Sequence, residues 1–65
     1  MTVKDVERAL LNIKDNQNDS ERAHVLEDEM WHSVLIAVAR GSKKAKELAK
    51  AALRSEKIEF RRWYA

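Results

Sequence analysis

The chain has no proline and a single glycine, Gly41, so it has few places where the backbone can turn sharply. Glycine and proline are the strongest local signals for turns and for the ends of helices and strands. Loops must therefore be few and short. Ala, Leu, Lys, Glu and Arg dominate the composition, and all five favour helix over strand. The sequence thus predicts an all-α fold.

The length of 65 residues allows one domain, so we expect a single helical domain over residues 1–65. There is no cysteine, which excludes disulfides and thiolate metal sites as sources of stability. A core of this size supplies about 3–5 kcal/mol of net stability. Self-association, as a homodimer, is therefore expected.

Apolar residues recur every three or four positions in three segments, which is the period of one helical face. The first helix is expected over residues 3–14, with Thr2 as its N-cap. The sequence DNQND at 15–19 has turn composition and no apolar residue, so it predicts a loop. The apolar face of this helix consists of Val3, Val6, Leu10 and Ile13.

The second helix is expected to begin after Asp19 or Ser20 and to end at Gly41, a suitable C-cap. Between Val34 and Ala39 it is apolar almost all round, which indicates a central helix covered on two sides or a helix that meets another chain. Its apolar face consists of Ala23, Leu26, Met30, Val34, Ala37 and Val38, with Trp31 and Leu35 at the shoulder. The surface predicted for self-association consists of Val25, Trp31, His32 and Ile36.

The third helix is expected to begin directly after the Gly41-Ser42 corner, with Ser42 as its N-cap. Continued without a break, its apolar stripe meets the aromatic residues near the carboxyl end but leaves Ile58 outside. A break or bend near Ser55 turns Ile58 inward instead, and burying it is worth about 1.5–3 kcal/mol, which favours the break. The stripe consists of Ala45, Leu48, Ala49, Ala52 and Leu53.

Charge is distributed unevenly. Residues 1–39 carry four Lys/Arg against eight Asp/Glu, and residues 40–65 carry nine against three. Basic residues recur at helical spacing along the third helix, and on a continuous helix they form one ridge that can neutralise phosphates. The ridge holds few side chains that read base edges, so binding would have weak sequence preference. The ridge consists of Lys43, Lys46, Lys50, Arg54, Lys57 and Arg61. The alternative is a solvated helix face.

Two sets of polar residues in the second helix could form a metal site or a catalytic site. His24, Asp28 and His32 share one flank, but their span of about 12 Å is too long for all three to bind one metal ion. We expect border residues with an Asp28–His32 pair, and no metal or other cofactor. Glu27 falls within the apolar stripe, where a buried carboxylate needs a cation or a hydrogen-bond donor. A structural pair with one Lys or Arg of the basic half is expected, and no catalytic residue is predicted.

The final six residues, FRRWYA, contain three of the four aromatic residues. Phe60, Trp63 and Tyr64 can stack nucleobases beside Arg61 and Arg62. The reading that we favour is packing on the core, because aromatic rings bury the largest area that a small chain can add. The predicted fold is thus a small three-helix bundle with a C-terminal aromatic segment packed on the core.

Two stretches, AHVLEDEMWHSVLIAVARG (23–41) and ELAKAALRSEKIEFRRWYA (47–65), resemble a group of short bacteriophage and prophage proteins. Those proteins show Ala-His-x-x-Glu-Asp, an apolar helix ending in Gly, and a closing Phe-x-Arg-Trp-x-Ala. The resemblance implies a small phage or bacterial protein and carries over no catalytic or binding residue. The lysine-rich linker after Gly41 departs from the group's pattern.

These observations predict a non-enzymatic adaptor or regulator that binds protein, either itself or a host or phage protein. The alternative function is nucleic-acid binding through the basic ridge. The longest uncharged run, residues 30–39, is too short to span a bilayer and has no signal-peptide layout, so no membrane contact and a cytoplasmic location are expected.

Overall fold

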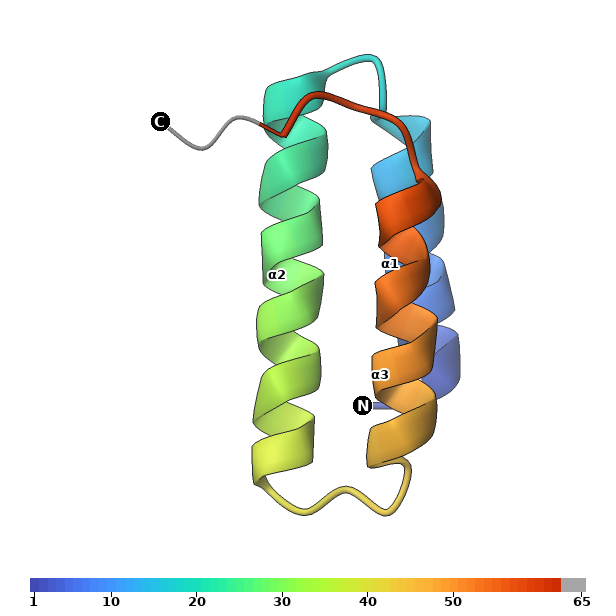
Figure 1. Ribbon diagram of the computed structural model, residues 1–65, viewed down its shortest axis with the longest axis vertical. Coiled ribbons are helices and arrows are strands. Elements are labelled where there is room, and N and C mark those ends of the chain that lie inside the picture. The colour runs from blue at the N-terminus through green and yellow to red at the C-terminus, as the bar shows by residue number, and fades with distance from the viewer. Residues whose placement is uncertain (63–65) are drawn as a thin grey trace.

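The computed structural model describes residues 1–62 and confirms an all-α three-helix bundle. The described elements are α1 (Val3–Asp15), α2 (Ser20–Ala39), α3 (Ala45–Leu53) and a short 3-10 helix, η1 (Arg54–Lys57). The chain runs up α1, down α2 and up α3, and residues 58–62 cross back towards the start of α2 (Figure 1). Each helix packs against both others, so α2 is not central.

Side-chain caps set where the first two helices begin. The Thr2 hydroxyl accepts a hydrogen bond from the Asp5 amide at 3.2 Å, and the Asp5 carboxylate accepts one from the Thr2 amide at 2.8 Å. This reciprocal capping box confirms Thr2 as N-cap. The Asp19 carboxylate accepts a hydrogen bond from the Arg22 amide at 3.1 Å and caps α2. The predicted loop therefore ends in a residue that starts the next helix.

Gly41 closes α2 as predicted. Its φ of +84° is left-handed, the region that glycine enters at least cost. The Gly41 amide donates to the Val38 carbonyl and the Ser42 amide donates to the Ala37 carbonyl, which is the Schellman pattern. The prediction that Ser42 is the N-cap of α3 is wrong. Its amide closes α2, and its hydroxyl accepts a hydrogen bond from the Lys44 amide at 3.2 Å, ahead of the first turn of α3. Lys44 is the N-cap of α3.

The predicted break near Ser55 is confirmed. The α-helix ends at Leu53, η1 tightens the chain, and Ile58 is extended with φ −82° and ψ 119°. Ser55 is fully buried at this point, and Ile58 is half-buried against the core. Ending α3 early therefore turns Ile58 inward, where a continuous helix would leave it outside.

The core consists of Val6, Ile13, Ala23, Met30, Val34, Leu48, Ala51 and Ala52. On α3 the predicted stripe is partly wrong, because Ala51 is buried while Ala49 is exposed and Leu53 is 54% exposed. Because α3 packs against α1 and α2 at once, the face that it buries is centred on Leu48, Ala51 and Ala52. Ala49 and Leu53 therefore lie at the edge of the bundle.

The prediction that the C-terminal aromatic residues pack on the core can be compared with the structure only at Phe60. Phe60 is half-buried and packs against the core. Trp63 and Tyr64, on which the same prediction rests, lie outside residues 1–62. Among the helices of the described chain, none has the length and apolar character needed to cross a bilayer.

Candidate protein-docking face

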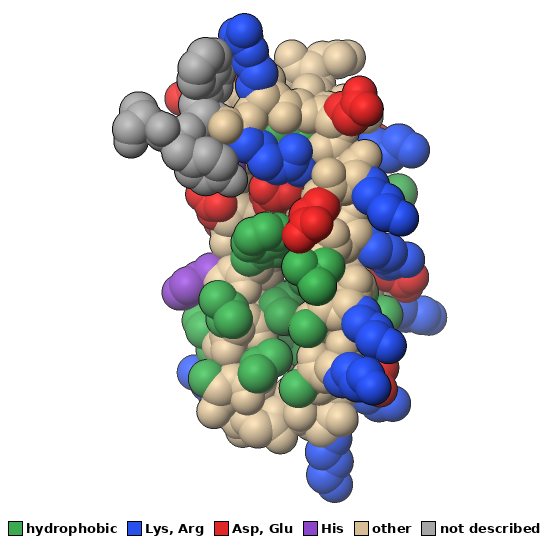
Figure 2. Space-filling view, in the orientation of Figure 1, with side chains coloured by type: hydrophobic (Ala, Val, Ile, Leu, Met, Phe, Trp, Pro, Cys, Tyr) green, Lys and Arg blue, Asp and Glu red, His purple; other side chains and the backbone are tan. Residues whose placement is uncertain are grey.

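An open apolar groove lies where α2 and α3 run side by side. We call it the α2–α3 groove; it encloses about 200 Å³ and is lined by Trp31, Val34, Leu35, Ala49, Ala52 and Leu53. Hydrophobic side chains gather over these two helices in one patch, with a column of Lys and Arg side chains beside it (Figure 2). None of the described residues that line the groove is charged, so its walls offer contact to apolar groups.

The α2 wall carries large side chains at helical spacing. Trp31, Leu35 and Val38 stand at positions i, i+4 and i+7 and are 37%, 66% and 38% exposed. On the α3 wall, alanines at 49 and 52 leave room between the helices, and Leu53 closes one side. Single exposed leucines are ordinary on protein surfaces, whereas a contiguous apolar patch marks an interaction site.

Trp31 is held in place by the end of α3 and by η1. Its indole N–H donates to the Ser55 hydroxyl at 3.1 Å and is 3.4 Å from the Ala52 carbonyl. These contacts satisfy the polar edge of the ring and keep the rest as a wall of the groove. A fixed, partly exposed tryptophan suits an anchor of a protein interface, because little conformational entropy remains to be lost on binding.

Beside the groove, α3 presents lysines. Lys46 and Lys50 are three residues before Ala49 and Leu53, so they are their neighbours on the helix surface. Both are exposed, and neither forms an ion pair within residues 1–62. The same is true of Lys43 and Lys57.

The two arginines of the predicted basic ridge make contacts elsewhere in the chain. Arg54 pairs with Glu7 of α1 at 3.4 Å, and both side chains are about half exposed. Since α3 ends at Leu53, Arg61 does not continue its face. It lies in residues 58–62, which we call the crossing segment, and its amide donates to the Ser20 hydroxyl at 3.4 Å. The chain therefore presents shorter groups of cations in place of one ridge of six.

Glu27 is buried at 3% exposure under the crossing segment. Arg62 binds both of its carboxylate oxygens, with Nε at 3.0 Å and Nη2 at 2.9 Å. The same guanidinium donates to the Ser55 and Ile58 carbonyls at 2.8 and 3.1 Å, and lies 3.9 Å from the Phe60 ring centroid. The predicted pairing of Glu27 with a cation of the basic half is confirmed.

Burial by itself raises the pKa of the Glu27 carboxyl. Hydrogen bonds from Arg62 and Ser55, and the charge of Arg62, outweigh burial and bring that pKa below its ordinary value. The carboxylate is thus charged and fully engaged at neutral pH. Its contacts are those of a structural pair that fastens residues 58–62 to α2.

Among His24, Asp28 and His32 of α2, the ion pair that forms differs from the predicted one. Asp28 pairs with His24 at 3.5 Å, so the predicted Asp28–His32 pair is wrong. Asp28 lies one turn from both, and the pair that forms is the one on its N-terminal side. Within the described part of the chain, no three His, Asp or Glu side chains gather closely enough to hold a metal ion.

The residues predicted for self-association separate into two groups. Val25, His32 and Ile36 share one exposed face of α2, with Val25 44% and Ile36 39% exposed. Trp31 turns instead towards α3 and belongs to the α2–α3 groove. The sequence assigned Leu53, which lines that groove, and Val38, which is 38% exposed, to apolar core stripes, and placed Leu35 at the shoulder of the α2 stripe. The run from Val34 to Ala39, which is apolar almost all round the helix, was the signal for such a surface.

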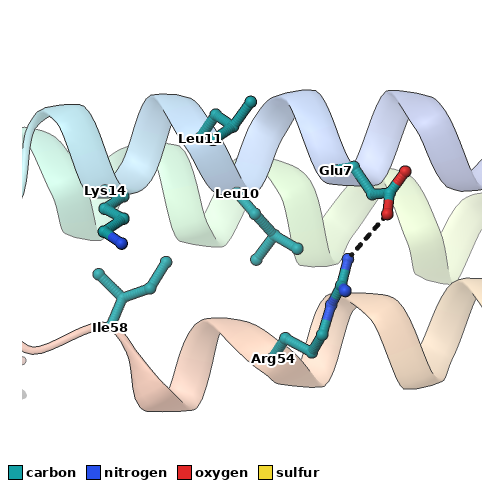
Figure 3. A pocket seen from close by; sticks show the side chains of 6 residues that line it. All are labelled: Glu7, Leu10, Leu11, Lys14, Arg54 and Ile58. Atoms are coloured by element: carbon teal, nitrogen blue, oxygen red, sulfur yellow. Dashed lines mark hydrogen bonds and ion pairs between the residues drawn. The ribbon is translucent and has the colours of Figure 1, made fainter.

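A second groove lies between α1 and the end of α3 and encloses about 490 Å³. Figure 3 shows Leu10 and Ile58 on its two sides, with the Arg54–Glu7 pair bridging it and Lys14 near Ile58. Although this groove is larger, an ion pair already spans it and charged side chains form much of its lining. The α2–α3 groove is therefore the better candidate for apolar recognition.

Comparison with known proteins identifies no relative: no family model, no curated protein and no solved structure matches this chain.

Proposed function

We propose that this chain is a non-enzymatic adaptor or regulator of phage or prophage type. It acts in the cytoplasm by docking an apolar helix of a host or phage protein into the α2–α3 groove. The observation that carries this proposal is the uncharged groove with Trp31 held in its wall by hydrogen bonds from the indole N–H. A helix is the expected occupant, because parallel walls from two helices accept the apolar stripe of a third.

The size of the groove suits a transient complex. Its α2 wall runs from Trp31 to Val38, about 10 Å along the axis, which matches about two turns of a docked helix. Covering the exposed part of Leu35 or Leu53, which are 66% and 54% exposed, is worth about 1–2 kcal/mol each, offset by the cost of association. A reversible complex of modest affinity fits an adaptor or regulator.

The test compares two leucines of similar exposure on different helices. Leu35 in the groove is 66% exposed and Leu11 on α1 is 63% exposed. A photo-crosslinking amino acid placed at position 35 in host cells is expected to capture a partner that position 11 does not. The captured protein is then purified, and its affinity should fall tenfold or more for Leu35→Lys but less than twofold for Leu11→Lys. Equal capture at both positions would contradict the proposed site.

Self-association is proposed through the other exposed face of α2, at Val25, His32 and Ile36. A homodimer is expected because the core is small and this face carries two partly exposed aliphatic side chains. Sedimentation equilibrium should give twice the chain mass at high concentration, and Ile36→Lys should return the mass to that of one chain. A monomer at every concentration would contradict this surface.

Nucleic-acid binding is the second candidate function. Exposed lysines at 43, 46 and 50 that form no ion pair within residues 1–62 favour it. Such binding predicts a gel shift of duplex DNA or RNA that weakens steeply between low and moderate salt. No shift at low salt would remove this candidate.

A further inference from the structure

We infer that the helix which docks in the α2–α3 groove carries two carboxylates four residues apart, on the flank that faces Lys46 and Lys50. This inference rests on the proposed function, because it specifies the partner of the same groove. The occupant is thus an amphipathic helix with an apolar stripe and one acidic flank, supplied by a protein other than this chain.

The spacing of the two lysines sets the spacing in the ligand. Lys46 and Lys50 are separated by four residues of α3, or about 6 Å along the helix axis. A docked helix that runs along the groove lies beside α3. Two carboxylates four residues apart on its near flank then stand about 6 Å apart as well, each opposite one ammonium group.

The two lysines on this side of the groove have no charged partner among residues 1–62. Lys46 and Lys50 form no ion pair within the described residues, whereas Arg54, one turn after Lys50, pairs with Glu7 of α1. An acidic flank that approaches the groove thus meets two ammonium groups that leave no ion pair with the described part of the chain. Complementary charge at the border of an apolar contact contributes selectivity and a faster association rate.

The chain itself does not supply such a ligand. Its acidic residues are Asp5, Glu7, Asp15, Asp19, Glu21, Glu27, Asp28, Glu29, Glu47, Glu56 and Glu59. Only Asp15 and Asp19 are four apart, and they belong to the end of α1 and the cap of α2 rather than to one helix. No helix described here offers the required pair, which disfavours a second copy as the occupant of this groove.

The test uses two designed helical peptides of about fourteen residues. Both carry leucines at i, i+4 and i+7, and they differ only in two flanking residues, which are Glu in one and Lys in the other. At low salt the Glu peptide is expected to bind about five- to tenfold more tightly to the wild-type chain, measured by fluorescence anisotropy of a labelled peptide. The preference should diminish at high salt.

Charge-reversed variants make the test specific. Lys46→Glu with Lys50→Glu should invert the preference between the peptides. The matched control, Lys4→Glu with Arg8→Glu, has the same spacing and the same change in charge on the exposed side of α1, and should leave the preference unchanged. Circular dichroism checks that each variant is folded.

The outcomes separate this inference from the proposed function. Equal affinity for both peptides, lost in Leu35→Lys, would overturn the acidic flank and leave the groove as the docking site. Failure of both peptides to bind at millimolar concentration would overturn both proposals. Displacement of the Glu peptide by a 20-base-pair DNA duplex at moderate salt, abolished by reversal of Lys46 and Lys50, would assign the lysines to phosphate and overturn the inference.

Discussion

Glu27 and Leu35 lie about two turns apart on α2, yet they invert the usual relation between polarity and burial. Glu27 is 3% exposed and Leu35 is 66% exposed. At the first position the crossing segment returns over α2 and brings Arg62, which compensates the buried charge. At the second position no described segment returns. Burial along α2 is therefore decided by what covers each turn, and the uncovered turn is the one available to a partner.

The largest expected loss of stability comes from truncating a core side chain of α2 that lies between Glu27 and Leu35. Met30 is 3% exposed, so Met30→Ala should lower the free energy of unfolding by about 2–4 kcal/mol through lost burial and a cavity. Leu35→Ala, on the same helix, should change it by less than about 0.5 kcal/mol. Urea denaturation followed by circular dichroism measures both. Equal losses would mean that Leu35 is covered in solution.

Removing the cation over Glu27 is expected to have the next largest effect. Arg62→Ala leaves a buried carboxylate without its partner, which costs about 3–5 kcal/mol for a fully buried pair. Because the Arg62 side chain is 24% exposed, we expect about 2 kcal/mol after allowing for solvent screening. Arg22→Ala, which removes an exposed arginine from α2, is the control and should change stability little.

A double variant separates charge from packing at the same position. Replacing both partners, as in Glu27→Leu with Arg62→Met, removes the uncompensated charge and should recover most of the stability lost in Arg62→Ala. If the double variant is no more stable than Arg62→Ala, the crossing segment contributes through its backbone contacts rather than through the ion pair.

The pH dependence of stability tests the same pair with a smaller effect. The pKa of Glu27 is lowered in the folded chain, so its contribution is present above the ordinary glutamate pKa and is lost as pH falls through the folded value. The melting temperature should therefore fall below about pH 4, and Glu27→Gln should make that fall shallower. A steeper fall in Glu27→Gln would contradict the assigned direction.

The smallest expected effect concerns the wall of the open groove. Trp31→Phe keeps an aromatic ring but removes the N–H donor to Ser55, and should cost about 0.5–1.5 kcal/mol. Ser55→Ala removes the same bond from the other side. In a double-mutant cycle the two losses should not add, and additive losses would show that the hydrogen bond contributes nothing to stability.

Local features of the bundle were predictable from the sequence because their signals lie within a few residues. Thr2 with Asp5 forms a capping box, Gly41 takes the left-handed conformation, and the cost of leaving Ile58 outside favoured the break near Ser55. The need of Glu27 for a cation followed from its place in an apolar stripe. Each of these depends on backbone geometry or on the cost of one buried group.

The candidate site was less predictable. Val38 and Leu53 carry the same apolar signal as true core residues, so periodicity assigned them to the core stripes, and it placed Leu35 only at the shoulder of one. Which of the nine Lys/Arg residues after position 39 reaches Glu27 depended on the path of the chain after Leu53. Similarly, Arg61 follows the spacing of the basic ridge but leaves it where the helix ends.

The amino-acid sequence by itself determined that the chain is helical, where two of its helices begin and end, and that a buried glutamate requires a cation. Only the tertiary structure decided that Arg62 is that cation and that one flank of α2 and α3 remains open. The physical reason is that helix formation and capping depend on neighbouring residues, whereas burial depends on which distant segment returns to cover a surface. Packing three helices together leaves part of each apolar surface outside, and the rotation of α3 decides which part.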